Sequence, residues 1–446
     1  MYNYNCPDCN EAKLQSDKNA RKINEVIDQV NALIQVNNET VDFIEEKANE
    51  VVGEIAEIKV NENISDLKTE IDEINSSLDN IVTNFENVDM PLTELVFKIG
   101  LNNLSPNIDY KGENITIPSN TIINGNNSTI HIKGVISVGE NVNIKNVNFI
   151  FDGIINRDIH GVCTSEDGFY IKVKDNDNFY IENCVLDGGT IELNNVKNFK
   201  INKCLINGAN CVVGTIQTFN NCQYGIIEDN VIKGGKTNGI GLRSSQKIKV
   251  LNNNIHNNGH SGIYTPYCYD IDIINNYVYD HYNHDGIDAN FSADNMLRNE
   301  NFNCRIKDNR CWNNKMTGIY VVGSGVEISG NELLYNGANG LRCSRWKQDD
   351  TTLQNNLKIF DNKIANNNNA LNTGTFSHNV LLDGIEKSII QNNFIIQDNP
   401  NTNVEYNLYI VSNVSYILDN YTKNKMDNPN EINVIGNNNI VRNIGE

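Results

Sequence analysis

The run Ile271-Asp272-Ile273-Ile274-Asn275-Asn276 contains the pattern that decides the fold. Ile271 and Ile273 alternate with a polar residue, and an asparagine closes the run. The same arrangement recurs in Ile248-Lys249-Val250-Leu251-Asn252-Asn253 and in Leu357-Lys358-Ile359-Phe360-Asp361-Asn362. A spacing of two predicts short β-strands and excludes helical repeats, in which apolar residues recur about every 3.6 positions.

Copies of this unit follow one another roughly 20 to 33 residues apart, which is typical of a solenoid made of short strands and turns. The closing positions are Asn230, Asn253, Asn276, Asn309, Asn331, Asn362 and Asn393, and Cys184 and Cys204 take the same place upstream. The sequence therefore predicts a parallel β-helix over residues 111–397.

Asparagine is unusually abundant, with 85 copies in 446 residues. It is a poor residue for ordinary helices and strands. In a solenoid, however, asparagine tolerates left-handed backbone at a sharp turn, and identical amides stacked about 4.8 Å apart can hydrogen-bond along the column. We therefore expect asparagine ladders at the turns.

An acidic segment precedes the repeats: residues 22–88 hold 16 acidic and 4 basic residues, within a net charge of −20. Its apolar residues are spaced alternately by three and four: Ile64, Leu67, Ile71, Ile74, Leu78, Ile81, Phe85 and Val88. Heptad spacing with β-branched residues predicts a coiled coil of three chains over 22–90. The alternative is one amphipathic helix packed on the β-helix.

The remaining segments are assigned by position. Residues 1–21 are predicted to be an attachment segment, 91–110 a linker, and 398–446 a β-cap or the end of the β-helix. No apolar run reaches the length of a membrane span, and the N-terminus lacks the pattern of a secretory signal. The negative charge argues against nucleic acid as a partner.

The 11 cysteines sit mostly in apolar strand patterns, so we expect buried thiols rather than disulfides. Cys6 and Cys9 form a lone C-x-x-C pair, which is half of a zinc site at most. A terminus without a metal is the preferred interpretation.

Candidate functional residues appear when the repeats are aligned on a glycine that precedes an inward apolar residue. Two places after this glycine, pointing outward, stand Gly241, Tyr264, Asp288, Tyr320 and Arg342. Two places before it stand Thr237, His260, His284, Met316 and Ala338, and four places after it stands Arg243. One outer wall is therefore expected to gather histidine, tyrosine, aspartate and arginine. The alternative is a solvated ladder without a ligand.

These residue types suit acid–base chemistry on a glycosidic bond or an anionic polymer, with aromatic rings against sugar faces. Asp288 is the preferred general acid or nucleophile, with Asp285, His284 and His260 as further catalytic candidates. Tyr264, Tyr320, Arg243 and Arg342 are candidate substrate-binding residues, joined by Trp346, Asp349 and Asp350 from a long connection after the wall.

Residues 110–446 resemble the pectate-lyase-like β-helix superfamily, and a coiled coil ahead of such a β-helix resembles bacteriophage tail spikes and pre-neck appendage proteins. Asn283-His284-Asp285-Gly286 is also similar to the Asn-Thr-Asp-Gly motif of polygalacturonases, although the order of the other motifs differs. The resemblance implies a homotrimeric virion protein. It would attach to other tail proteins through its N-terminus and act on a host surface polysaccharide or teichoic acid.

Three functions follow from these observations. The first is a depolymerase, with hydrolysis favoured over a lyase reaction; a hydrolase needs no metal, whereas a lyase of this superfamily often uses calcium. The second is a non-catalytic, lectin-like receptor-binding spike. The third is a purely structural appendage, for which the wall of His, Tyr, Asp and Arg would have no use.

Overall fold

The computed structural model describes residues 93–106, 108–151, 170–208, 214–291, 301–344, 353–368, 378–398, 404, 406–424 and 432–445. The predicted attachment segment 1–21 and the predicted coiled coil 22–90 lie outside these residues. The chain divides into two units, Met1–Met90 and Pro91–Glu446. The description below concerns the second unit.

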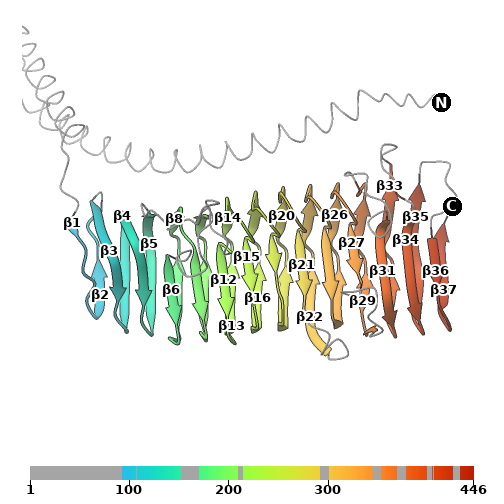
Figure 1. Ribbon diagram of the computed structural model, residues 1–446, viewed down its shortest axis with the longest axis horizontal. Helices are drawn as coiled ribbons and strands as arrows, with labels where there is room; N and C mark the ends of the chain where they lie inside the picture. The colour runs from blue at the N-terminus through green and yellow to red at the C-terminus, as the bar shows by residue number, and fades with distance from the viewer. Residues whose placement is uncertain are drawn as a thin grey trace, which may run out of the picture. The chain divides into compact units, whose positions relative to one another are not determined.

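The described residues of this unit form a solenoid of 37 strands joined by parallel pairing. In Figure 1 the strands follow one another along the long axis in chain order, from blue β1–β3 to red β36 and β37. Each coil contributes up to three short strands, and each strand pairs with the equivalent strand of the next coil. Residues far apart in sequence are thereby placed in columns on one wall.

The first coils contain β1 (Thr93–Glu94), β2 (Gly100–Asn103), β3 (Asp109–Ile117), β4 (Thr121–Val138) and β5 (Val142–Phe151). The first series after them consists of β6 (Ile171–Lys174), β9 (Ile191–Asn194), β12 (Ile216–Phe219), β15 (Ile240–Leu242), β18 (Ile263–Tyr264), β21 (Ile287–Asn290), β24 (Ile319–Val322), β27 (Leu341–Cys343), β31 (His378–Glu386), β34 (Tyr406–Asn413) and β36 (Ile432–Ile435).

The second series consists of β7 (Phe179–Glu182), β10 (Phe199–Asn202), β13 (Gln223–Glu228), β16 (Gln246–Leu251), β19 (Tyr269–Ile274), β22 (Asn301–Lys307), β25 (Ser324–Ser329), β29 (Lys358–Phe360), β32 (Ile389–Gln391), β35 (Tyr416–Asn424) and β37 (Ile440–Gly445), and β28 (Gln354–Asn355) pairs separately with β31. The third series consists of β8 (Val185–Asp187), β11 (Leu205–Asn207), β14 (Val231–Lys233), β17 (Asn254–His256), β20 (Tyr277–Tyr279), β23 (Arg310–Trp312), β26 (Glu332–Leu334), β30 (Lys363–Ala365) and β33 (Phe394–Gln397).

The solenoid begins earlier than the sequence pattern indicated. β1 and β2 lie within the predicted linker 91–110 and pair with β3 and β4. Phe97 and Leu104 are each only 6% exposed, so this segment buries apolar side chains although its alternation is irregular. The segment 398–446, predicted as a β-cap or the end of the β-helix, contributes the regular strands β34 to β37, which continue the stack.

The interior is a continuous column of branched aliphatic side chains. The apolar residue after the aligned glycine points inward in every coil that was compared: Ile240, Ile263, Ile287, Ile319 and Leu341 are all fully buried. Burial of one such side chain stabilises the fold by about 1.5–3 kcal/mol. This inward column fixes the register, because a slip by one residue would turn the apolar face outward.

The predicted asparagine ladder is confirmed. However, the ladder hydrogen bonds and the left-handed backbone, which we assigned to one asparagine, belong to two neighbouring residues. Each ladder asparagine donates to the side-chain oxygen of the next; for example, Asn276 Nδ2 lies 3.0 Å from Asn309 Oδ1, and Asn309 Nδ2 lies 3.0 Å from Asn331 Oδ1. The left-handed backbone belongs to the preceding residue, such as Asn275 with φ 56° and Asp308 with φ 55°.

A second ladder, which the sequence analysis did not identify, runs along the turn between the third and first series. Asn314, Asn336 and Asn367 are linked by side-chain hydrogen bonds of 2.9 Å. His281 takes the place of asparagine one coil earlier and accepts a hydrogen bond from the Asn258 backbone at Nδ1. Its Nε2 and the Oδ1 of Asn314 have no hydrogen-bond partner among the described residues.

The cysteine prediction holds for the part of the chain that is described. The seven cysteines there are all buried and free: Cys184, Cys204, Cys222, Cys268, Cys304, Cys311 and Cys343. The pair Cys6 and Cys9 lies outside the described residues. Within those residues, no helix has the length and apolar character needed to cross a membrane.

Candidate active site

The outer wall of the first strand series carries the predicted column in the predicted register. Tyr264 pairs with Gly241 on one side and with Asp288 on the other, and Asp288 pairs with Tyr320. Tyr320 then pairs with Arg342. Alignment on the repeat glycine therefore placed residues that span about a hundred positions of sequence in one row on the solenoid.

The two histidines predicted to share a column lie in direct contact. The rings of His260 and His284 stack with their centroids 4.2 Å apart and an angle of 14° between their planes. Ser261 joins them, because its Oγ lies 3.3 Å from His260 Nδ1 and 3.1 Å from His284 Nδ1. Asn238 Oδ1 contacts His260 Nδ1 at 3.2 Å and fixes the first ring.

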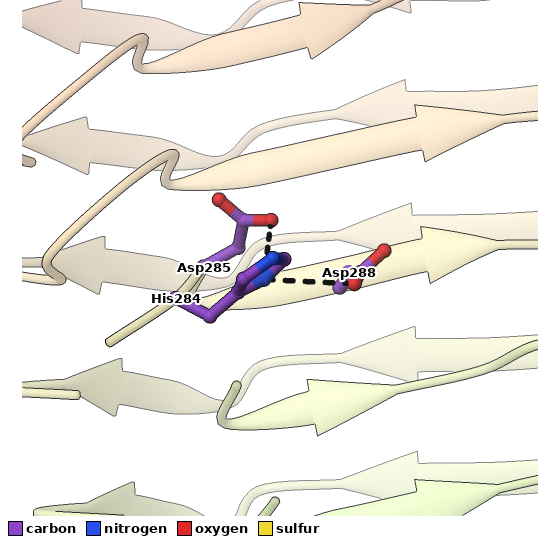
Figure 2. A group of neighbouring side chains, drawn as sticks. All are labelled: His284, Asp285 and Asp288. Atoms are coloured by element: carbon purple, nitrogen blue, oxygen red, sulfur yellow. Dashed lines mark ion pairs between the residues drawn. The ribbon is translucent and has the colours of Figure 1, made fainter. Parts of the chain in front are cut away.

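His284 also faces two carboxylates (Figure 2). Its Nδ1 lies 2.9 Å from Oδ2 of Asp285 and 3.7 Å from Oδ2 of Asp288. The shorter contact is a charge-assisted hydrogen bond, in which the imidazole N–H donates to Asp285. With the proton at Nδ1, Nε2 is the ring nitrogen left for proton transfer, and the His284 side chain keeps 30% of its surface exposed.

Asp285 is held by the next coil. Its Oδ1 accepts a hydrogen bond of 2.7 Å from the backbone N–H of Thr317, and the residue is 3% exposed. The alignment predicted that Asp285 faces inward at the turn. It is buried as expected, but its second oxygen turns to His284, because the turn that follows His284 brings the two side chains together.

Asp288 is buried rather than solvent-facing. Sequence alternation predicted an outward side chain, yet the residue is only 4% exposed, and all of β21 is buried on both faces. Burial raises the pKa of Asp288 to about 8, the charge of Asp285 acts in the same direction, and His284 and Arg342 oppose the shift. A carboxyl group with this pKa is protonated at neutral pH, and its Oδ1 has no hydrogen-bond partner among the described residues.

The two histidines have opposite pKa shifts. Burial lowers the pKa of His284, but the hydrogen bond to Asp285 and the charge of Asp285 act against burial, and the net shift is upward. For His260, burial and the charge of His284 lower the pKa. Neighbouring groups with diverging pKa values are typical of sites of acid–base chemistry.

The tyrosines and one arginine flank Asp288. The guanidinium of Arg342 lies 4.9 Å from the centre of the Tyr320 ring, and its Nε donates to Ser344 Oγ at 2.8 Å. Burial, followed by the charge of Asp288, raises the pKa of Tyr264 to about 12. Arg243 is exposed at the edge of the group, with its guanidinium 6.0 Å from the Phe219 ring.

Three predicted substrate-binding residues, Trp346, Asp349 and Asp350, lie outside the described residues. The sequence analysis missed Ser261, Asn238 and Thr317, which position the histidines and Asp285. Ser261 directly follows His260 in sequence, but the contact of its hydroxyl with His284 arises only from stacking of two coils.

His284, Asp285 and Asp288 are the one group of metal-ligand side chains found in the described part of the chain, with one ligand atom of each within 4.8 Å of the others. The spacing would admit a cation. His284 and Asp285 are joined by a 2.9 Å hydrogen bond, and Asp288 lies 3.7 Å from the same nitrogen. We interpret the group as an acid–base cluster because a buried carboxyl group with a raised pKa lies beside a hydrogen-bonded His–Asp pair.

A family model described as the right-handed beta helix region matches residues 215–395. Together with the parallel register, this match defines the fold as a right-handed parallel β-helix. No curated protein matches the chain.

Several solved structures have a similar fold. The A-module of mannuronan C-5 epimerase AlgE4 from Azotobacter vinelandii is 14% identical with a TM-score of 0.47, and the match covers 76% of this chain and 91% of that one. The surface adhesin PfbA of Streptococcus pneumoniae is 12% identical with a TM-score of 0.42, covering 74% and 83%. The Dettilon tailspike protein is 13% identical with a TM-score of 0.38, covering 71% and 56%.

Proposed function

We propose that this protein is a depolymerase that binds and cleaves a surface polysaccharide or wall polymer on the wall formed by β18, β21, β24 and β27. One observation carries the proposal: the buried carboxyl group of Asp288 lies 3.7 Å from the ring of a hydrogen-bonded His284–Asp285 pair, where burial raises the pKa of Asp288 to about 8. Keeping a carboxyl group buried with an unsatisfied oxygen costs about 1–3 kcal/mol, and a catalytic role is one reason for which proteins retain such a group.

The chemistry follows from the protonation states. Asp288 donates its proton to the glycosidic oxygen as the bond to the sugar carbon breaks. His284 accepts a proton at Nε2 from the attacking water, while Asp285 holds the ring and balances the imidazolium charge. The water oxygen forms the new bond to carbon, so one water molecule is consumed and no other reactant is needed. Tyr264 offers aromatic surface for a sugar ring. Tyr320 is only 8% exposed and lies under Arg342, whose guanidinium suits an anionic substituent.

A non-catalytic receptor-binding spike is the second candidate, and the burial of Asp288 favours it. A side chain that is 4% exposed meets substrate only if the wall opens around it. The same wall would then act as a lectin, with Tyr264 and Arg342 as contacts and the carboxyl group as a structural element.

The test is incubation of the full chain with purified capsule, exopolysaccharide and teichoic acid, followed by product sizing and mass spectrometry. Hydrolysis adds the mass of water to each product, whereas elimination leaves an unsaturated end. Parallel samples with calcium and with a chelator separate the two chemistries, because our mechanism has no metal step. Polymers that stay at full length in every sample would favour the receptor-binding function.

We further propose that the protein is a homotrimeric virion spike, attached through residues 1–21 and assembled through the heptad segment 22–90. The proposal rests on the spacing of the apolar residues in that segment. Light scattering should give the mass of three chains, and deletion of residues 1–90 should give one chain. A monomeric full-length protein at micromolar concentration would contradict this assembly.

A further inference from the structure

A second wall of the solenoid contains a groove that the proposed chemistry does not use. The groove has a volume of about 650 Å³ and opens over β13, β16, β19 and β22. These strands belong to the second series, and none of the candidate site residues lines the groove. β19 and β22 follow β18 and β21 in the same coils, so the groove lies on the next wall of the coils that carry the candidate active site.

The edge of the groove is formed by a column of residues with left-handed backbone. Asn198, Tyr224, Lys247, Asp270 and Asn303 occupy the same place in successive coils, with φ between 52° and 56°. Asparagine and aspartate adopt this conformation readily, but it is strained for other residues with a side chain. Tyr224 and Lys247 are therefore costly occupants of positions where asparagine would serve the fold better.

The side chains at these two positions form one surface. Tyr224 is 51% exposed. The ammonium of Lys247 lies 5.1 Å from the centre of the Tyr224 ring and 3.3 Å from its hydroxyl. An exposed aromatic ring with a cation at its side is suited to a sugar, whose apolar face stacks on the ring while a negative substituent meets the cation.

The charged side chains in the groove differ in whether they have a hydrogen-bonded or ion-pair partner. Asp272 is held by Arg305 through two contacts of 2.7 Å, and Asp270 accepts a 2.7 Å hydrogen bond from Asn303. Lys249 also lines the groove, and neither it nor Lys247 has a carboxylate partner in the described part of the chain. Arg305 is thus paired with Asp272, whereas the hydrogen bond to Asp270 comes from a neutral amide. With Lys247 and Lys249 beside Tyr224, the lining holds three basic and two acidic side chains.

We propose that this groove binds an anionic saccharide, which stacks on Tyr224 and places its negative charge between Lys247 and Lys249. A uronate and a phosphate-bearing sugar share this chemistry, so both are tested. The site would hold an acidic polymer while another part of that polymer reaches the neighbouring wall. Binding at the groove does not depend on cleavage and stands even if the protein has no catalytic activity.

Calorimetric titration of the full chain with short oligogalacturonides, with a glycerol phosphate oligomer and with neutral maltohexaose tests the proposal. At least one anionic probe should bind, and the neutral probe should bind about tenfold more weakly or not at all. Binding should weaken as salt rises from low to physiological concentration. The tighter of the two anionic probes identifies the source of the charge.

Two variants separate recognition from folding. Tyr224→Asn replaces a strained tyrosine with a residue that prefers the left-handed backbone, so the melting temperature should stay equal or rise while binding falls about tenfold or more. Lys249→Gln should reduce the affinity for the anionic probes by a similar factor. Lys358→Gln, at an exposed lysine farther along the same column as Lys249, is the matched control and should bind as the wild type does.

The binding measurements test the groove separately from the proposed cleavage. Loss of binding in Tyr224→Asn and Lys249→Gln, with normal binding in an Asp288→Asn variant, would assign the groove as a separate site. Wild-type affinity in both groove variants, equal affinity for maltohexaose, or no binding of either anionic probe at millimolar concentration would overturn the proposal. None of these results depends on whether the polymer is cut.

Discussion

His284 Nδ1 lies 2.9 Å from Oδ2 of Asp285, and the same nitrogen lies 3.7 Å from the protonated carboxyl group of Asp288. One imidazole therefore contacts two carboxyl groups in different surroundings. Asp285 accepts a hydrogen bond from the Thr317 backbone N–H, whereas no described residue donates to Asp288 Oδ1. In the proposed mechanism Asp285 accordingly holds the His284 ring, and Asp288 donates the proton.

The pH dependence of cleavage should have two limbs. Activity requires neutral His284, whose pKa is raised, so the rising limb should lie above the ordinary imidazole value of about 6.5. It also requires protonated Asp288, so activity should fall as pH passes about 8. Initial rates at low substrate concentration across pH report these limbs. A rate that stays high well above pH 9 would exclude Asp288 as the acid.

Replacement of Asp288 by asparagine should also change the pH dependence of stability. The folded-state pKa is about 8 and the unfolded value is about 3.9, so the folded wild type binds more protons between these values and loses stability as pH rises through them. Asp288→Asn removes this loss. Its free energy of unfolding should exceed that of the wild type at pH 8 by about 1 kcal/mol or more, and the difference should be smaller at pH 4. Equal urea unfolding curves for the two proteins at pH 8 would mean that Asp288 is not held neutral.

The buried His281 should make the fold sensitive to acid. Burial lowers its pKa to about 3, so between about pH 3 and 6.5 the unfolded state binds more protons, and stability falls as pH falls through that window. The variant His281→Asn places an asparagine at this position, as in the other coils of the second ladder. We expect a gain of about 1–3 kcal/mol from the two satisfied polar atoms and a flatter acid dependence, measured by urea unfolding from pH 4 to pH 7. His131→Asn, at a partly exposed histidine, serves as the control. A destabilised His281→Asn protein would show that the imidazole fills this position better than an amide does.

The two asparagine positions of each turn should respond differently to substitution. Asn309→Ala removes the acceptor for Asn276 and the donor to Asn331, at a cost of about 2–4 kcal/mol, and Asn309→Gly should be no better. At Asn275 the left-handed backbone dominates, because its side-chain hydrogen bond to Asn252 Oδ1, at 2.8 Å, is exposed. Asn275→Ala should therefore cost about 1 kcal/mol, and Asn275→Gly should be nearly neutral. Thermal melts of the four variants provide the comparison. Recovery of stability by Asn309→Gly would contradict the division of tasks.

The columns of the site were predictable because a β-helix repeats its geometry. Once the glycine before Ile263 and Ile287 set the phase, the neighbours of Tyr264 and Asp288 followed from strand alternation. The stacking of His260 on His284 followed in the same way. Local sequence therefore predicts which side chains become neighbours in a column wherever successive coils pair in a regular register.

Burial and partner choice were not predictable in this way. Alternation indicates the wall on which Asp288 stands, but not that the wall is covered, because that depends on other segments of the coil. The turn of Asp285 toward His284 and the bridging role of Ser261 depend on side-chain torsions and on contacts between coils. The register shift of β22 against β25 between Asn301 and Cys304, at one end of the groove, is likewise not encoded by the repeat pattern.

The most direct test of the proposed function is the rate at which the Asp288→Asn protein shortens the polymer that the wild type cleaves, with Asp361→Asn, at an exposed turn residue, as the control. Chromatographic product sizing over time gives the rates. We predict a rate at least about a hundredfold lower for Asp288→Asn, a wild-type rate for the control, and intact folding of both proteins. Cleavage by Asp288→Asn within a few fold of the wild-type rate would contradict the assignment of Asp288 as the proton donor.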